Sequence, residues 1–340
     1  MNDSGPVSER YLEAVLARCR VLDESQARQF LLHGYLHLPS CFDAEFARPL
    51  VEAAYARLGY DPEKPATWEQ ELAYPDHDRR FLIAEISPRC WGAICDLLGG
   101  EDRIAPKPFS IGRSNHFSSV DSTHWSDAFI INFRYGADQP WQPPSATVAG
   151  WHKDGGYFRH FLDSPEQALV TIIYWSDVGS RAAGTFVAPD SVGHIARGLA
   201  RHPEGLEPKE DLGELVADAL RRSSRFCELT GGTGDVFLVH PFMLHASSYN
   251  HSGRPRFMTN PPVALRQPMC FARDDPADYS LLELSVLDAL SSERLDFQPT
   301  RQRRLFSPIT NETIGLSPCA SGSPRVGHSG YRFVKEERFA

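Results

Sequence analysis

Two stretches of this chain, GWHKDGG at residues 150–156 and GDVFLVHPFMLHASSYN at residues 234–250, decide its fold. In an extended strand, side chains two residues apart point to the same side, so His152 and Asp154 can face one point together. An imidazole and a carboxylate suit a divalent first-row metal ion. The second stretch opens with the apolar run 236–239, which predicts a strand, and then supplies a further histidine, His245.

Two histidines and one carboxylate form the facial triad of non-haem iron(II) oxygenases, which leaves three positions on one face of the metal open. We therefore predict that His152, Asp154 and a later histidine, His245 or His240, are the metal ligands. His240 also lies near a strand end and competes with His245 for the third position. The pattern thus favours an iron-dependent oxygenase over a simple binding protein.

The open positions require a cosubstrate, and a 2-oxo acid can chelate the metal through its carboxylate and its keto oxygen. Its far carboxylate then needs a buried cation, and arginine suits this because its planar guanidinium binds a carboxylate bidentately. Arg256, on the strand after His245, is our candidate, and Arg254 is its rival. The hydroxyl of Ser247 can add a hydrogen bond to the same carboxylate.

The rest of the chain divides into a helical part and a β-rich part. Apolar spacing predicts helices over residues 8–22, 24–34, 43–58, 84–98, 211–222 and 278–290. Short β-rich runs separated by turn residues lie at 35–39, 129–135, 148–153, 169–175, 185–188, 226–229, 236–239 and 257–265. We expect one domain over residues 1–300, with a helical part at 1–102, a β core at about 103–266 and a C-terminal helix at 278–290; residues 301–340 are predicted to form a peripheral tail.

Composition narrows the class of partner. The 340 residues hold 35 basic and 44 acidic side chains, a formal net charge of −9, so neither nucleic acid nor an anionic membrane surface is an expected partner. No run of about 18 apolar residues predicts a membrane span, and the N-terminus does not resemble a signal peptide. The seven cysteines form no C-x-x-C pair. These features favour a cytoplasmic enzyme, a monomer or a homodimer, acting on a small molecule.

Taken together, the motifs resemble the phytanoyl-CoA dioxygenase family of iron(II)/2-oxoglutarate oxygenases. The resemblance rests on the H-x-D motif, on the run from Gly234 through His245 to Arg256, and on the entry FLLHGYLHLP at residues 30–39. A further match is GTFVAPDS at residues 184–191, although Asp190 stands where the family usually has glycine. The resemblance covers roughly residues 24–266.

The resemblance implies a double-stranded β-helix, a jelly roll (cupin-like) with flanking helices, which uses Fe(II), 2-oxoglutarate and O₂. It implies that His152, Asp154 and His245 are the catalytic iron ligands and that Arg256, helped by Ser247, pairs with the C5 carboxylate of 2-oxoglutarate. By position in the family pattern, the remaining cofactor-binding candidates are Asn132, Thr185 and Trp175. Iron halogenases of the family replace the carboxylate ligand with a small residue, so Asp154 argues against halogenation.

The resemblance also implies the reaction class, a hydroxylation, and natural-product biosynthesis is the setting we favour. The alternatives are a cupin-like protein that binds a metal or ligand without turnover, and an acyl-CoA hydroxylase. Desaturation, cyclisation and epimerisation stay open. The segment after the H-x-D motif is expected to line the mouth of the barrel and touch substrate; its candidates are Tyr157, Phe158, Arg159 and His160.

Overall fold

The computed structural model describes residues 6–77, 79–106, 121–208 and 210–306, and three short strands beyond them. The helices are α1 (Val7–Leu16), α2 (Glu24–His33), α3 (Ala44–Leu58), α4 (Ile83–Ile86), α5 (Pro88–Leu98), α6 (Ser191–Ala200), α7 (Glu210–Arg222) and α8 (Leu281–Leu290). The strands are β1 (Tyr35–Leu38), β2 (Leu72–Ala73), β3 (Arg80–Leu82), β4 (His124–Ser126), β5 (Ile130–Asn132), β6 (Leu169–Tyr174), β7 (Thr185–Ala188), β8 (Cys227–Glu228), β9 (Val236–Val239), β10 (Leu244–Ser247), β11 (Arg256–Thr259), β12 (Pro262–Val263), β13 (Leu305–Phe306), β14 (Thr313–Ile314), β15 (Leu316–Ser317) and β16 (Arg332–Phe333).

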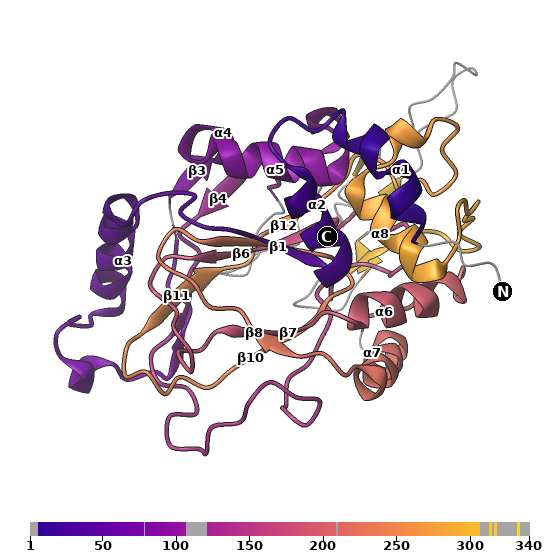
Figure 1. The fold of residues 1–340 in the computed structure, drawn as a ribbon. Coiled ribbons are helices and arrows are strands. Elements are labelled where there is room, and N and C mark those ends of the chain that lie inside the picture. Colours follow the sequence, from indigo (N-terminus) through magenta and orange to yellow (C-terminus); the bar gives the residue numbers. More distant parts are fainter. Residues whose placement is uncertain are drawn as a thin grey trace, which may run out of the picture.

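Two antiparallel sheets form the core. The larger has the order β1-β9-β6-β11-β5-β2, with β12 paired to β6, and the smaller has the order β10-β7-β8. Figure 1 shows the small sheet below the large one, and helices α4 and α5 above. This arrangement confirms the predicted jelly roll with flanking helices.

Strand register separates the two faces of the large sheet. Met258 pairs with Tyr174 and Arg256 pairs with Asn132, so these side chains share one face. The opposite face carries Phe257, whose ring lies 5.3 Å from that of Tyr55 on α3. Helix α3 therefore covers the outer face, and the face of Arg256 and Tyr174 is the inner one.

The small sheet presents its own inner face to this space. Thr185 Oγ1 lies 4.0 Å from Met258 Sδ, so Thr185 points toward the large sheet. Ser247 pairs with Thr185 across β10 and β7, and His245 lies two residues before Ser247 on the same side. The interior between the sheets thus receives the predicted third ligand.

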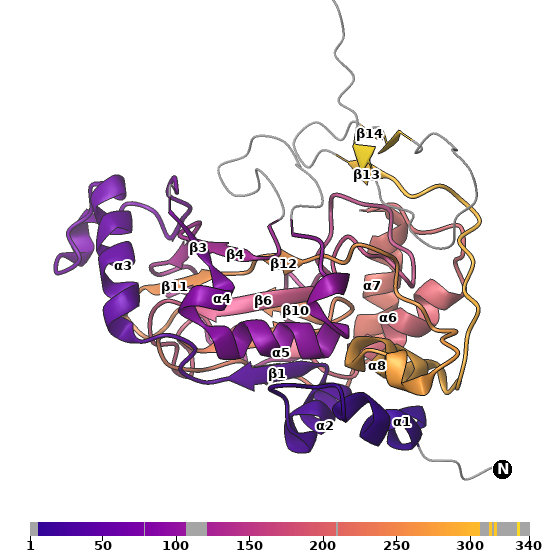
Figure 2. The same ribbon diagram turned by 90° about the horizontal axis from the view of Figure 1, so that it is seen from above.

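Local sequence explains where several helices begin and end. An Asp23–Gln26 capping box starts α2, and Gly34 ends it in the left-handed conformation at φ +69°. The predicted helix 84–98 is instead two helices, because Pro88 lacks the backbone N–H that would continue α4 and begins α5 at its first position. Figure 2 shows α5 lying along the large sheet.

The predicted strand at 148–153 is reduced to a single bridge between His152 and His245. In the described part of the chain, no helix is long and apolar enough to cross a membrane.

The C-terminal boundary of the domain was predicted wrongly. Residues 301–340 were expected to be peripheral, yet Leu305 is 2% exposed and pairs with Phe158 in an antiparallel bridge. Arg303 is also buried and pairs with Asp163 at 2.6 Å. Residues 302–306 therefore belong to the packed domain. Most of the predicted tail beyond them lies outside the described residues.

Candidate metal centre

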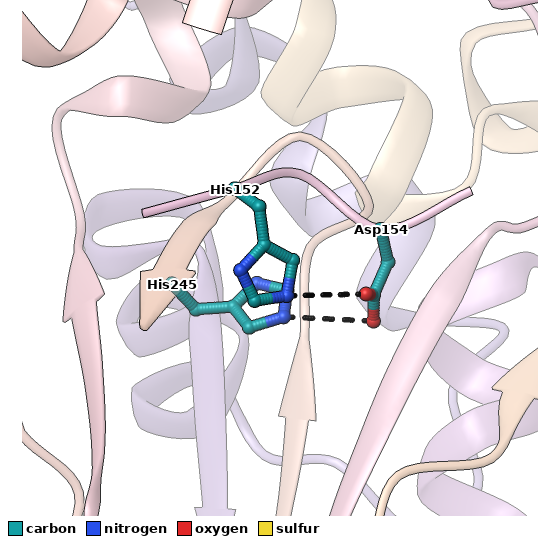
Figure 3. Close-up of side chains that lie close together, drawn as sticks. All are labelled: His152, Asp154 and His245. Carbon is teal, nitrogen blue, oxygen red and sulfur yellow. Dashed lines mark ion pairs between the residues drawn. The ribbon is translucent and has the colours of Figure 1, made fainter. Parts of the chain in front are cut away.

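The three predicted ligands come together at the edge of the small sheet, where His152 bridges to His245 on β10 (Figure 3). The backbone N–H of each histidine donates to the carbonyl of the other, both at 3.0 Å. This pairing sets the two rings 4.3 Å apart between centroids. Asp154, two residues after His152, then faces both rings.

The ligand atoms are close enough for one metal ion. His152 Nε2 lies 3.5 Å from Asp154 Oδ1, and His245 Nε2 lies 3.5 Å from Asp154 Oδ2. One ligand atom from each residue lies within 4.8 Å of the others. In the described part of the chain, this is the one such group of three or more histidine, cysteine or acidic side chains.

Backbone carbonyls fix the orientation of both imidazoles. His152 Nδ1 lies 2.8 Å from the carbonyl of Gly150, and His245 Nδ1 lies 3.2 Å from that of Met243. A carbonyl only accepts, so each Nδ1 carries a proton, and Nε2 is the nitrogen that faces Asp154 and that would bind a metal ion. Hydrogen bonding of the second ring nitrogen is a usual feature of metal-binding histidines. The donor set therefore fits a divalent metal ion.

The pKa values of His152 and Asp154 depend on each other. Burial raises the pKa of Asp154, but the charges and hydrogen bonds of His245 and His152 outweigh this effect and hold it below its usual range. Burial lowers the pKa of His152, and Asp154 more than compensates, so the net direction is upward. The carboxylate is thus ionised and available to a cation.

Arg256 is a buried cation without an acidic partner among the described residues. It is 3% exposed, and Nη1 donates to the carbonyl of Ala183 at 3.2 Å and contacts Met258 Sδ. Its Nε is buried and has no hydrogen-bond partner. Burial lowers its pKa to about 10, against the opposing influence of Tyr174 and Tyr74, so it is charged at neutral pH. An unsatisfied buried guanidinium fits an anionic ligand.

Three further cofactor candidates face the same interior. Asn132 lies opposite Arg256 in the register, is 1% exposed, and accepts a hydrogen bond from the backbone of Tyr135. Thr185 is buried near Met258. Ser247 is exposed and lies on the same side of β10 as His245. The fold thus brings these three candidates to the side of the sheets that carries the ligands and Arg256.

Trp175, the fifth cofactor candidate, lies on the wrong face of the large sheet. Its indole Nε1 donates to Thr259 Oγ1 at 3.0 Å, and its ring packs against Phe42 and Phe129. Its neighbour Tyr174 takes the inner face instead, with its hydroxyl donating to the carbonyl of Leu229. The prediction of a cofactor contact for Trp175 is therefore wrong, because strand alternation turns it toward α3.

The predicted substrate segment is packed rather than open. Phe158, Arg159 and His160 are 0%, 2% and 1% exposed, and Tyr157 is also buried at 8%. Arg159 forms an ion pair with Glu207 and donates to the carbonyl of Gln302 at 2.7 Å. Residues 302–306 cover this segment, and its contact with substrate stays a prediction.

The structure also decides both rivalries. His240 is fully buried; its Nδ1 accepts from the backbone of Phe242 at 3.0 Å and its Nε2 lies 2.9 Å from Ser285 Oγ, so neither nitrogen is free for a metal. Burial and the charge of Lys153 lower the pKa of His240 to about 3. Arg254 is exposed and so makes no buried anchor. His245 and Arg256 remain the candidates.

Two residues of the inner space were missed at the sequence level. Tyr174 lies opposite Met258 on the inner face, and Tyr74, which follows β2, lies close enough to influence the pKa of Arg256. Their signal was weak, because an aromatic residue in or beside a strand is far more often part of the core. Lys153, the residue between His152 and Asp154, is also buried.

Comparison with protein families then gives the decisive match. The model of the family described as phytanoyl-CoA dioxygenase (PhyH) matches residues 30–258, about two thirds of the chain, including all three ligands and Arg256. The chain belongs to the phytanoyl-CoA dioxygenase family. It is therefore an iron(II)- and 2-oxoglutarate-dependent oxygenase, and O₂ is its second cosubstrate. No curated protein matches the sequence.

Solved structures with a similar arrangement are distant from this member of the phytanoyl-CoA dioxygenase family. SnoK, a carbocyclase from nogalamycin biosynthesis, is 15% identical with a TM-score of 0.42, over 73% of this chain and 86% of that one. HygX from Streptomyces hygroscopicus, with nickel and 2-oxoglutarate bound, is 13% identical with a TM-score of 0.39, over 72% and 87%. EctD from S. alaskensis, with 2-oxoglutarate and 5-hydroxyectoine, is 18% identical with a TM-score of 0.39, over 72% and 77%.

Proposed function

We propose that this oxygenase hydroxylates a small organic molecule at an iron centre held by His152, Asp154 and His245. The overall reaction converts 2-oxoglutarate, O₂ and a substrate C–H bond into succinate, CO₂ and a substrate C–OH group. Bound iron(II) supplies the redox chemistry that activates O₂. The observation that carries the proposal is the convergence of two Nε2 atoms and one carboxylate, with each Nδ1 held by a backbone carbonyl.

Arg256 supports the assignment of the cosubstrate. A guanidinium that is buried, charged and lacks an acidic partner among the described residues is costly unless an anion pairs with it. The far carboxylate of 2-oxoglutarate is such an anion, and bidentate pairing would satisfy the orphaned Nε. Thr185 and Ser247 would line the path between Arg256 and the ligand His245, and Asn132 would lie beside the guanidinium.

Asp154 favours hydroxylation over halogenation, because the carboxylate occupies the position that a halide would need. It also balances one of the two charges of the metal, while the neutral imidazoles add none. We propose a natural-product substrate as the preferred class and an acyl-CoA as the alternative.

The test is formation of succinate from 2-oxoglutarate with Fe(II), measured against Asp154→Ala, Arg256→Gln and Arg254→Gln. Asp154→Ala is expected to abolish turnover. Arg256→Gln removes the anchor, a charge-assisted pairing, and is expected to raise the KM for 2-oxoglutarate by about 100-fold. Arg254→Gln, the exposed neighbour on the same segment, is the matched control and should leave KM unchanged.

Turnover that survives Asp154→Ala would contradict the metal site, and an unchanged KM in Arg256→Gln would contradict the anchor alone. A protein that binds Fe(II) and 2-oxoglutarate but forms no succinate with any candidate substrate would favour the non-catalytic alternative. Coupled succinate release across panels of natural products and acyl-CoA esters then separates the two substrate classes.

A further inference from the structure

Lys153 has a buried amine directly behind the metal centre. It stands between His152 and Asp154 in the chain, points away from the interior, and is 6% exposed. Its Nζ donates to the backbone carbonyl of Asp154 at 3.1 Å and lies 3.0 Å from His160 Nδ1. The side chain therefore contacts the turn that carries the carboxylate ligand.

His160 completes this contact from the other side. Its Nε2 lies 2.8 Å from the carbonyl of Gly155, so Nε2 carries the proton and Nδ1 accepts from Lys153. The backbone of His160 exchanges two hydrogen bonds with Leu206, at 2.8 and 2.9 Å, which fixes its position. Together the two side chains hold the consecutive carbonyls of Asp154 and Gly155.

The amine of Lys153 is held by hydrogen bonds and not by an ion pair. Among the described residues no carboxylate lies within ion-pair distance of its Nζ, although Asp154 and Glu166 act on it electrostatically at longer range. The rings of Phe158 and Phe242 enclose it, with centroids at 5.5 and 5.8 Å. Its polar contacts are therefore the carbonyl of Asp154 and the ring of His160.

The turn itself needs an external restraint. Gly155 has φ +112°, a conformation that L side chains rarely adopt, and a Cβ there would lie 2.6 Å from His160 and 2.5 Å from Phe158. Glycine has no side chain whose contacts could hold the backbone of the turn in one conformation. The hydrogen bonds from Lys153 and His160 hold the turn in place instead.

We propose that Lys153 and His160 form a positioning pair that holds Asp154 in the geometry needed to bind the metal. The inference rests on the proposed function of His152, Asp154 and His245. Each member of the pair acts through the backbone of the Asp154–Gly155 turn. Groups that orient metal ligands from behind typically change metal affinity by about 10- to 100-fold when they are removed.

The experiment measures the affinity of the full chain for Mn(II) by electron paramagnetic resonance, alongside the Tm of the metal-free protein. Lys153→Met and His160→Leu remove the hydrogen bonds and are expected to weaken Mn(II) binding by about 10-fold or more. His160→Gln keeps one acceptor and one donor, so it should restore affinity to within about threefold of wild type. Arg159→Met is the matched control, because it removes a buried cation of the same segment that pairs with Glu207 instead.

The outcomes separate this inference from the proposed function. Failure of the wild-type protein to bind Mn(II) would contradict the metal centre itself. Wild-type binding together with equal binding by folded Lys153→Met and His160→Leu proteins would overturn the positioning pair alone. If both variants and His160→Gln fail to fold, or if Arg159→Met loses as much affinity as they do, the pair serves general stability and the proposal is also overturned.

Discussion

The two histidines of the metal centre are oriented by the same kind of local hydrogen bond. In each case Nδ1 donates to the carbonyl of the residue two positions earlier, Gly150 for His152 and Met243 for His245. A side chain held by its own backbone loses its choice of tautomer before any metal arrives. Because the contact spans only two residues, it depends little on the rest of the fold and so preorganises each ligand separately.

Gly155 gives a prediction at the same scale. Gly155→Ala should destabilise the protein by about 1–3 kcal/mol, because the new Cβ meets Phe158 and His160 in a backbone conformation at φ +112°. The strain falls on the turn that carries Asp154, so Mn(II) affinity should fall as well. Thermal unfolding and Mn(II) titration measure the two effects.

The neighbouring glycine is the control. A Cβ on Gly156 would meet nothing within 4 Å, so Gly156→Ala is expected to change neither Tm nor affinity appreciably. Equal effects of the two substitutions would show that the turn responds to any added side chain and that the conformation of Gly155 is not special.

Residues 302–306 form a packed segment that the sequence did not predict. It lies beside residues 157–161: Arg159 N–H donates to the carbonyl of Arg304 at 2.9 Å, and Phe306 N–H donates to that of Tyr157 at 2.8 Å. This strand-like pairing covers the segment that contains His160. The C-terminal chain therefore supports the metal turn from a distance of some 150 residues in sequence.

Truncation tests this role. A chain ending at Thr300 should have a lower Tm than one ending at Phe306, because it loses the buried Leu305 and the Arg303–Asp163 pair. It should also bind Mn(II) more weakly, since His160 loses its cover. Equal Tm and affinity in the two truncated chains would contradict a supporting role for this segment.

At the scale of the whole molecule, the buried charges behind the metal turn predict a pH dependence of stability. Burial raises the pKa of Glu166 to about 7, against the opposing charge of Arg303, and its Oε2 has no hydrogen-bond partner. The neighbouring charges are Asp163, Arg303 and Lys153. The folded state thus prefers the neutral acid.

The pKa of Glu166 is higher in the folded than in the unfolded protein, so stability decreases as the pH rises. In the unfolded chain Glu166 titrates near 4.5, so its favourable contribution is complete below that pH and is lost as the pH rises through about 7. Glu166→Gln mimics the neutral acid, so its stability relative to wild type should rise between pH 5 and pH 8, by on the order of 3 kcal/mol. Denaturant unfolding at several pH values measures the difference, and parallel profiles for the two proteins would refute it.

The ligand residues and most of the core strands could be predicted from the sequence. The spacing of His152, Asp154 and His245 predicted a ligand set that the structure brings within 4.8 Å, and the strands after residue 103 were largely placed correctly. For His152 and Asp154 a spacing of two residues is enough, because it places both side chains on a common side; His245 joins them through its backbone bridge to His152.

Which side of a strand becomes the interior was decided only by tertiary structure. Trp175 and Tyr174 are neighbours, and either could have faced the cofactor; pairing of β6 with β11 gave that side to Tyr174. The segment Tyr157–His160 became core because residues 302–306 return to cover it. The sequence by itself thus determined the family, the H-x-D pair of ligands and the order of elements, whereas the structure decided between His245 and His240 for the third ligand. The burial of each candidate depended on register and on contacts between distant segments, whose energies no local pattern records.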